Sequence, residues 1–355
     1  MMRSNPGDDD DTVKLRPASM RQPSRSSRLP LALAAAAGGA VVVAAAAWLL
    51  WPHSAPPAPP AAPAPVARTA KAPIAAPPAP MAQRPAPPEF AIQTADEQQI
   101  RDDVPTGMTV FRFAADQRIV VLDFASLHEQ GMMLNRVAAL IEKGATPRDR
   151  VLTEDQLNQA IHAGGDTVST YYYGHDYSVA ELVRFFALAD SEHVQLYPEE
   201  EKLRRLVRQL GWFLPEAEGG LISIPKVGAN ARVTYEARSA ILHHELSHGE
   251  YFSNPTYVAY VHEFWEHSLS HIERQGVRKF LASEEYDPSL GDLMQNEMQA
   301  YLMFTRDPLF FTAADIGMPP TRLATLQAEF DRNLPVGWLH QMMDEPLAVQ
   351  ATVSK

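Results

Sequence analysis

Hydrophobic and polar positions change their period along the chain, and each change predicts a different element. Residues 109–113 and 118–124 are short, rich in β-branched side chains and bounded by polar residues, as is typical of strands. Residues 153–156 and 178–181 each place Thr or Ser three positions before Gln or Glu, the capping box that opens a helix. Residues 219–225 begin with two glycines and continue as a short apolar strand. The last third is almost wholly helical in pattern, so we expect an α+β fold with a mostly helical C-terminal half.

An uncharged apolar run occupies residues 29–51. At about 1.5 Å per residue it is long enough to cross a hydrocarbon core of about 30 Å. Cations precede the run, and the next one after it is Arg68, so the positive-inside rule places the N-terminus in the cytoplasm. We expect a single-pass signal anchor in the inner membrane, with the following domain facing the periplasm or the exterior. An unusually long cleaved signal peptide is the alternative, and it would export the same part.

Proline and alanine dominate residues 52–88. This composition favours an extended, disordered linker that holds the domain away from the membrane, although a Pro-rich run can also bind a partner domain. The predicted organisation is a cytoplasmic tail (1–28), the transmembrane anchor (29–51), the linker (52–88) and two parts of an exported globular region (89–218 and 219–345).

Charge and cysteine content narrow the chemistry. The net charge is −12, which argues against a nucleic-acid partner, because phosphate binding needs clustered Lys and Arg. The chain has no Cys, so disulfides, thiolate ligands and a Cys nucleophile are excluded. Any metal ion must therefore be held by His and carboxylate side chains.

The segment 236–252 (EARSAILHHELSHGEYF) has helical spacing and contains the string HELSH at 244–248. His244 and His248 are one turn apart, so both imidazoles can reach one ion. Glu245 is rotated by about 100° from His244 and can approach the open position of the metal as a base. We expect Gly249 to weaken the helix and Asn254-Pro255 to end it. His243 points away from this face and is predicted to be a surface or supporting residue.

A third ligand is best sought as a carboxylate on a later helix. Glu297 is the polar member of an apolar stripe that also contains Leu293, Tyr301 and Phe304. A carboxylate facing a core is costly unless it is paired or binds a metal. The alternatives are a Glu297 satisfied by a nearby Arg or His, and Glu266 as the third ligand.

Two further histidines, His267 and His271, are four residues apart. They could form a second metal pair, but acidic neighbours make a solvated helix face the more ordinary interpretation.

HELSH, followed about fifty residues later by NEMQAY, resembles the gluzincin branch of the zincin metallopeptidases. The resemblance implies a zincin-like domain in which His244, His248 and Glu297 ligate one Zn²⁺ and Glu245 is the general base. Thermolysin-like enzymes carry an Asp that orients a ligand histidine at the place of Tyr301, so that support must come from elsewhere. Tyr301 is instead a candidate for stabilising the oxyanion, in competition with Tyr257 and a nearby His.

The chain also resembles uncharacterised exported bacterial proteins with a HELSHGE-type motif, which suggest no substrate. Residues 221–225 stand where zincins keep the edge strand that pairs with an extended peptide. The aromatic string 171–177 (YYYGHDY) is expected in the core and at a helix start, or lining a substrate cleft with His175.

These features predict a zinc metallopeptidase acting on peptide or protein substrates. Zinc would lower the pKa of a bound water, and Glu245 would carry its proton to the leaving amine. Glu245→Gln should keep zinc but lose activity, whereas His248→Ala should lose zinc. The rivals are a non-catalytic binding or scaffolding protein of the cell envelope and a hydrolase of non-peptide amides.

Overall fold

The computed structural model describes residues 87–344. The predicted tail (1–28), the anchor (29–51) and nearly all of the linker (52–88) lie outside the described residues, as does position 345. Within 87–344, no helix is both long enough and apolar enough to cross a membrane. The described part combines one sheet with many helices, so the α+β prediction is confirmed.

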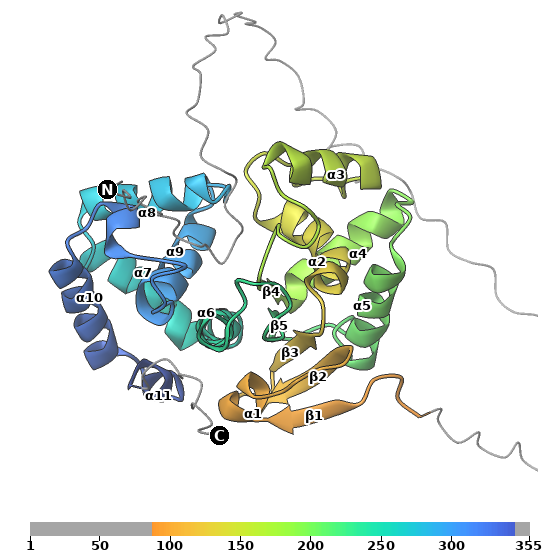
Figure 1. The fold of residues 1–355 in the computed structure, drawn as a ribbon, viewed down its shortest axis with the longest axis horizontal. Coiled ribbons are helices and arrows are strands. Elements are labelled where there is room, and N and C mark those ends of the chain that lie inside the picture. The colour runs from red at the N-terminus through yellow and green to blue at the C-terminus, as the bar shows by residue number, and fades with distance from the viewer. Residues whose placement is uncertain (1–86, 345–355) are drawn as a thin grey trace, which may run out of the picture. The chain divides into compact units, whose positions relative to one another are not determined.

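The sheet has five strands in the order β1-β2-β3-β5-β4 (Figure 1). They are β1 (Ile92–Ala95), β2 (Met108–Phe113), β3 (Ile119–Phe124), β4 (His175–Ser178) and β5 (Gly220–Pro225). β1 pairs parallel to β2 and β3 parallel to β5, whereas the β2–β3 and β4–β5 pairs are antiparallel. β2, β3 and β5 match the predicted strands. β1 and β4 were not predicted, because each has four residues and neither has an apolar run.

β5 is an inner strand, and this corrects the expectation that residues 221–225 form an edge. All six of its residues are buried, as is usual for a strand covered on both faces. The edge strand next to β5 is β4, which begins within the aromatic string 171–177. Because β5 lies between β3 and β4, the parts 89–218 and 219–345 share one sheet.

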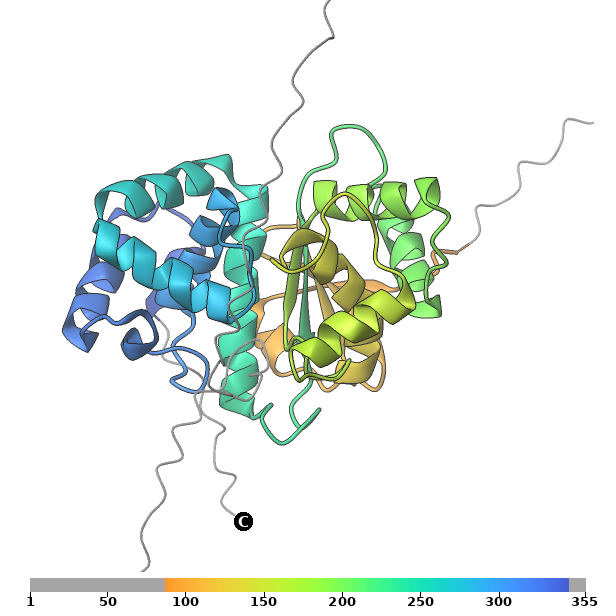
Figure 2. The same cartoon turned by 90° about the horizontal axis from the view of Figure 1, so that it is seen from above.

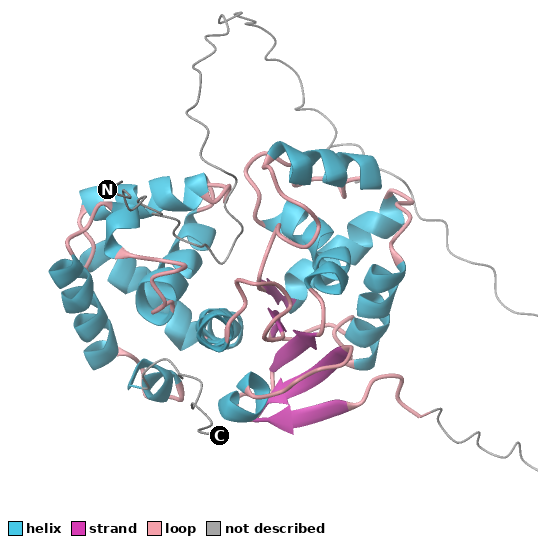
Figure 3. Ribbon diagram, viewed as in Figure 1, coloured by secondary structure: helices cyan, strands magenta, loops and turns pink. Residues whose placement is uncertain are grey.

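The helices divide between the two faces of the sheet (Figures 1 and 3). α2, α4 and α5 cover one face, and the region from α6 to α11 covers the other. The first group and its neighbour α3 are α2 (Leu127–Ile141), α3 (Glu154–Ala163), α4 (Val179–Ser191) and α5 (Pro198–Gln209). The short helix α1 (Glu97–Arg101) belongs to the other face, where its Ile100 packs in the core with α6. The second group is α6 (Tyr235–Ser253), α7 (Pro255–His267), α8 (His271–Ser283), α9 (Gly291–Gln299), a π-helix η1 (Ala300–Phe304), a 3₁₀-helix η2 (Ala313–Ile316), α10 (Pro320–Asn333) and α11 (Leu339–Asp344). The predicted capping boxes do open α3 and α4, with Thr153 and Ser178 as N-caps.

Alternate residues of β3 enter two hydrophobic cores. Val120 and Leu122 face the core with α2, α4 and α5, whereas Ile119 and Val121 face the core with α6. Figure 2 shows α6 between the sheet and the other C-terminal helices. A helix enclosed on both sides is buried almost all round, and this places polar residues of α6 in the interior.

Two glycines allow α6 to approach the sheet closely. A Cβ at Gly249 would lie 2.8 Å from Cγ2 of Ile119, and a Cβ at Gly220 would lie 2.7 Å from the ring of Phe252. The helix is unbroken at Gly249 and continues to Ser253, because the close packing against Ile119 needs a residue without a side chain there. Asn254 ends α6 and caps α7, whose first residue is Pro255, in agreement with the predicted end.

Candidate metal centre

Three side chains from two helices meet in the interior between α6 and the segment formed by α9 and η1. Nε2 of His244 and Nε2 of His248 are 3.0 Å apart. Glu297 Oε2 lies 3.9 Å from each of these nitrogens. Two ligands about 2.0–2.1 Å from a tetrahedral ion are about 3.3 Å apart, so these separations suit one metal ion. The three side chains form a buried group that could bind a metal ion.

The hydrogen bonds behind the imidazoles assign their tautomers. The hydroxyl of Thr305 donates to the carbonyl oxygen of Ala300 (3.0 Å), so it accepts from Nδ1–H of His244 (2.8 Å). Asn296 Oδ1 accepts from the side-chain amide of Gln299 (3.3 Å) and from Nδ1–H of His248 (2.9 Å). Both Nε2 atoms therefore present lone pairs to each other. A cation between them removes that repulsion, so the donor set fits a metal.

The protein environment keeps both imidazoles neutral. Burial lowers the pKa of His248 to about 4, although the bond to Asn296 opposes the shift. Burial and the neighbouring His248 lower the pKa of His244 well below its usual range. Neutral imidazole is the form that binds a metal ion, so proton competition for the site is weak at neutral pH.

Glu245 lies beside this group without joining it. Its side chain is buried, and among the residues that the structure describes none donates a hydrogen bond to its Oε2. Burial, with the charges of Glu297 and Glu142, raises the pKa of Glu245 well above its usual range. An uncompensated buried carboxylate is costly in a core, and a nearby cation would reduce that cost.

Gly174 makes room for the Glu245 carboxylate. A Cβ at Gly174 would lie 2.0 Å from Oε1 of Glu245, closer than any side chain tolerates. Gly174 immediately precedes β4, so the edge strand begins directly against this carboxylate.

Asp176, two residues further along β4, faces His248. Its Oδ2 lies 3.6 Å from Nδ1 of His248. Burial and the carboxylates of Glu142, Glu245 and Glu297 raise the pKa of Asp176 well above its usual range.

Asn296 belongs to a chain of buried hydrogen bonds. Tyr257 donates to the amide oxygen of Gln299 (2.6 Å), whose nitrogen donates to Ser247 (3.1 Å) as well as to Asn296. The Tyr257 hydroxyl is thus engaged away from the metal ligands, and this argues against an oxyanion role for it.

A cavity of about 170 Å³ adjoins the His248 side of the centre. Asp176 and Asn296 form part of its wall, with carboxylates of Glu142, Glu181 and Asp292 and several apolar side chains. The centre itself is closed: the three candidate ligands and the adjacent Glu245 are each at most 3% exposed.

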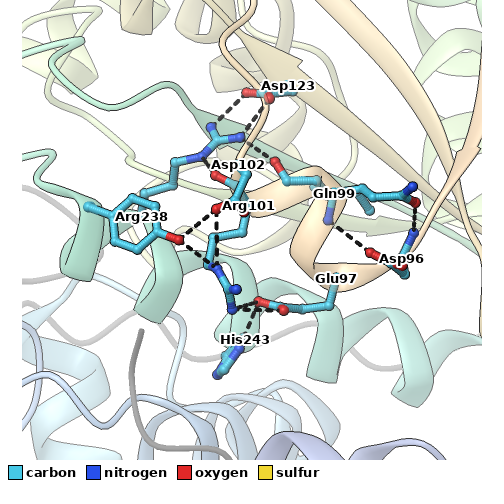
Figure 4. A network of polar contacts seen from close by, with 10 residues as sticks. Asp96, Glu97, Gln99, Arg101, Asp102, Asp123, Arg238 and His243 are labelled. Atoms are coloured by element: carbon cyan, nitrogen blue, oxygen red, sulfur yellow. Dashed lines mark hydrogen bonds and ion pairs between the residues drawn. The ribbon is translucent and has the colours of Figure 1, made fainter. Parts of the chain in front are cut away.

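A separate polar network fixes the N-terminal half of α6 (Figure 4). Arg238 uses all five of its N–H groups: two bind the Asp123 carboxylate (2.8 and 2.6 Å), and three bind the carbonyl oxygens of Pro225, Ile100 and Arg101. His243 contributes on the same side, with Nε2 3.1 Å from Oε1 of Glu97. His243 is therefore buried in a supporting network rather than on the surface.

Of the other residues that the sequence proposed for the site, one lies at the centre and the others lie away from it. Tyr301 reaches the centre, and its buried ring lies edge-on to His244 with the ring centroids 4.8 Å apart. Glu266 is exposed on α7 and does not belong to the metal-binding group, so it is wrong as a third ligand. His267 ends α7 and His271 begins α8, and both are exposed, as expected for a solvated surface.

His175 is a buried core residue on the other face of β4. Its Nδ1 lies 3.1 Å from Oγ of Ser223 and its Nε2 lies 3.2 Å from Oδ1 of Asn135, and burial lowers its pKa to about 3. The core interpretation of the aromatic string is therefore correct for His175.

Sequence reasoning missed Thr305, Asp176 and Gly174. The one sequence feature that could have indicated Gly174 and Asp176 is the alternation of side chains along β4, which puts both of them on the face opposite His175.

No protein-family model, curated protein or solved structure matches the chain.

Proposed function

We propose that this chain is a zinc-dependent hydrolase of peptide bonds, similar to the gluzincins. The observation that carries the proposal is Glu245, a buried carboxylate beside a two-histidine, one-glutamate donor set, whose Oε2 has no hydrogen-bond partner within residues 87–344. A purely structural metal site has no need of such a group, whereas hydrolysis needs a base next to the metal.

The roles follow from the positions of the side chains. His244, His248 and Glu297 would hold the ion, and neutral imidazoles with one carboxylate are a donor set that suits Zn²⁺. Zinc supplies Lewis acidity, which makes water nucleophilic near neutral pH and polarises a carbonyl group. Glu245 Oε2 would take a proton from the attacking water and return it to the amine as the C–N bond breaks. Tyr301 would stabilise charge on the carbonyl oxygen.

The location of the protein is part of the same proposal. Residues 29–51 would anchor the chain in the inner membrane, and the described region would face the periplasm or the exterior. Peptide or protein substrates would therefore come from the cell envelope.

Burial of the centre favours a second candidate, a non-catalytic binding or scaffolding protein of the envelope. Each of the four central side chains is at most 3% exposed, and Gly174 lies directly on the Glu245 carboxylate. Turnover requires this region to open for a peptide, whereas a structural metal site does not.

The deciding experiment joins metal content to activity. The full chain, purified in detergent, should contain one equivalent of zinc and cleave members of a peptide library, and a chelator should abolish cleavage. Zinc at one equivalent without cleavage of any library member would support the scaffolding role instead. A chain that binds no divalent metal would contradict both candidates.

A further inference from the structure

Both nitrogens of the His244 imidazole have a close neighbour. Nε2 faces His248 at 3.0 Å, and Nδ1 lies 2.8 Å from the hydroxyl of Thr305. The side chains of His244 and Thr305 are both buried, so no solvent competes for these positions. An imidazole that lacks a partner at Nδ1 can take the other tautomer, with its proton on the nitrogen that should bind the metal.

The hydroxyl of Thr305 has only one proton, and its direction is set. That proton goes to the carbonyl oxygen of Ala300 at 3.0 Å, which leaves only lone pairs for His244. The chain of bonds therefore runs from Nδ1–H of His244 to the Thr305 oxygen and from the Thr305 hydroxyl to Ala300. This order selects the tautomer that has a free Nε2.

A π-turn brings Thr305 to this position. It lies eight positions after Glu297, and an unbroken α-helix would leave the two side chains about 80° apart around the axis. The helix changes to π geometry over Ala300–Phe304 (η1), where each residue rotates the chain less. The backbone N–H of Thr305 closes the last wide turn on the same Ala300 carbonyl at 2.9 Å. Glu297 and Thr305 thus reach the same imidazole from one helical segment.

We propose that Thr305, delivered by this π-turn, is the residue that positions His244 for metal binding. It takes the part that an Asp at position 301 plays in thermolysin-like enzymes. Tyr301 occupies that place, and its ring packs edge-on against the imidazole, which restrains the ring plane. A hydrogen-bonded partner of this kind typically changes metal affinity by about 10–100-fold when it is removed. The inference rests on the proposed metal centre and is independent of whether the site hydrolyses anything.

The test compares two substitutions with opposite properties. Thr305→Val keeps the shape of the side chain but loses the hydroxyl, whereas Thr305→Ser keeps the hydroxyl but loses a methyl group. Zinc affinity of the full chain would be measured by competition with a chromophoric chelator, and the ligand field would be followed in the cobalt-substituted protein. We expect Val to bind zinc about 10–100-fold more weakly than wild type, and Ser to stay within a few-fold of it.

A packing role for Thr305 predicts the reverse order, with Val close to wild type and Ser impaired. That order, or equal affinity in all three proteins, would overturn the proposal. Thr325→Val is the matched control, because the Thr325 hydroxyl also donates to a carbonyl in its own helix (Thr321, 2.9 Å) but is exposed on α10.

If Thr305→Val does not fold, Thr305→Ala replaces it, since Ala also lacks the hydroxyl without filling the site. A wild-type chain that binds no divalent metal overturns this inference together with the proposed function. Normal zinc binding without hydrolysis overturns the function alone.

Discussion

Two groups of buried polar side chains lie along α6, and they differ in how their charges are balanced. At the N-terminal half, the Arg238 guanidinium gives every N–H to an acceptor, and the Asp123 carboxylate balances its charge. About two turns further along, Glu245 has an oxygen to which none of the described residues donates, beside Glu297 and two neutral imidazoles. The first group is complete within the protein, whereas in the second the Oε2 of Glu245 has no hydrogen-bond donor among the described residues, and a nearby divalent cation would stabilise its ionised form.

This difference distinguishes a structural polar network from a candidate functional centre. Protein interiors tolerate charge when it is paired and hydrogen-bonded, as it is around Arg238. An interior position that stays unsatisfied next to a metal-like donor set is better explained by a ligand than by stability. Three changes test this distinction, and a fourth gives a reference outside both groups; their expected effects decrease in the order given.

Arg238→Met should have the largest effect, lowering the free energy of unfolding by about 4 kcal/mol. The reason is that Asp123 and three carbonyl groups would lose their buried partner. Denaturant unfolding of the metal-free protein measures this change. The double variant with Asp123→Leu should recover part of the loss, because it removes the stranded carboxylate. An unchanged unfolding midpoint in Arg238→Met would show that the network is not structural.

Glu245→Gln should reduce hydrolysis by about 100-fold or more, which is about 3 kcal/mol in activation free energy, while zinc stays bound. Its metal-free form should also be more stable than wild type, since a buried charge has been removed. Peptide cleavage, metal content and thermal unfolding report these quantities. Glu250→Gln is the matched control in the same helix, because Asn254 and Trp338 already satisfy that carboxylate. Full activity in Glu245→Gln would exclude it as the base.

Gly174→Ala should lower hydrolysis by about 10–100-fold, because the new Cβ displaces the Glu245 carboxylate from its position. Zinc affinity should change little, since the three ligands are not touched. The ratio of kcat to KM for a cleaved peptide measures the effect. Gly107→Ala is the control, because a Cβ at that glycine meets no atom within 4 Å. Equal losses in both variants would mean that the close contact at Gly174 is unimportant.

Acidification should produce the smallest effect, through a surface pair outside both groups. The Arg322 guanidinium, 2.7 Å away, lowers the pKa of Glu273 to about 2, with help from the N-cap Ser270. Because the folded-state pKa is below the unfolded value of 4.5, this stabilisation is present above pH 4.5 and is lost as the pH falls towards 2. The pair is partly exposed and screened by solvent, so the loss is about 1 kcal/mol. Unfolding at pH 5 and pH 3 measures it, and Glu273→Gln should remove this part of the pH dependence.

Local sequence patterns predicted those helices and strands whose capping residues or apolar runs lie within the element itself. Thr153 and Ser178 predicted where α3 and α4 begin, because all the residues of a capping box lie within four consecutive positions. β4 escaped prediction because its four residues alternate a buried and a half-buried side chain without an apolar run. β5 was predicted as a strand but misplaced at the edge, since strand order depends on pairing with segments about 45 and 100 residues away in the sequence.

What the sequence by itself determined is which three residues form the buried group that could bind a metal ion. The helical period places His244 and His248 on one face, and Glu297 stands out as the charged residue of an apolar stripe. What only the tertiary structure decided is the surroundings of that group. Thr305 contacts His244 because of a π-turn, which no pattern of residues predicts. Gly174 and Asp176 come from the edge strand, and the register of β4 on β5 sets their positions. Ligand spacing is a property of one helix, whereas orientation and charge balance depend on contacts between segments far apart in the chain.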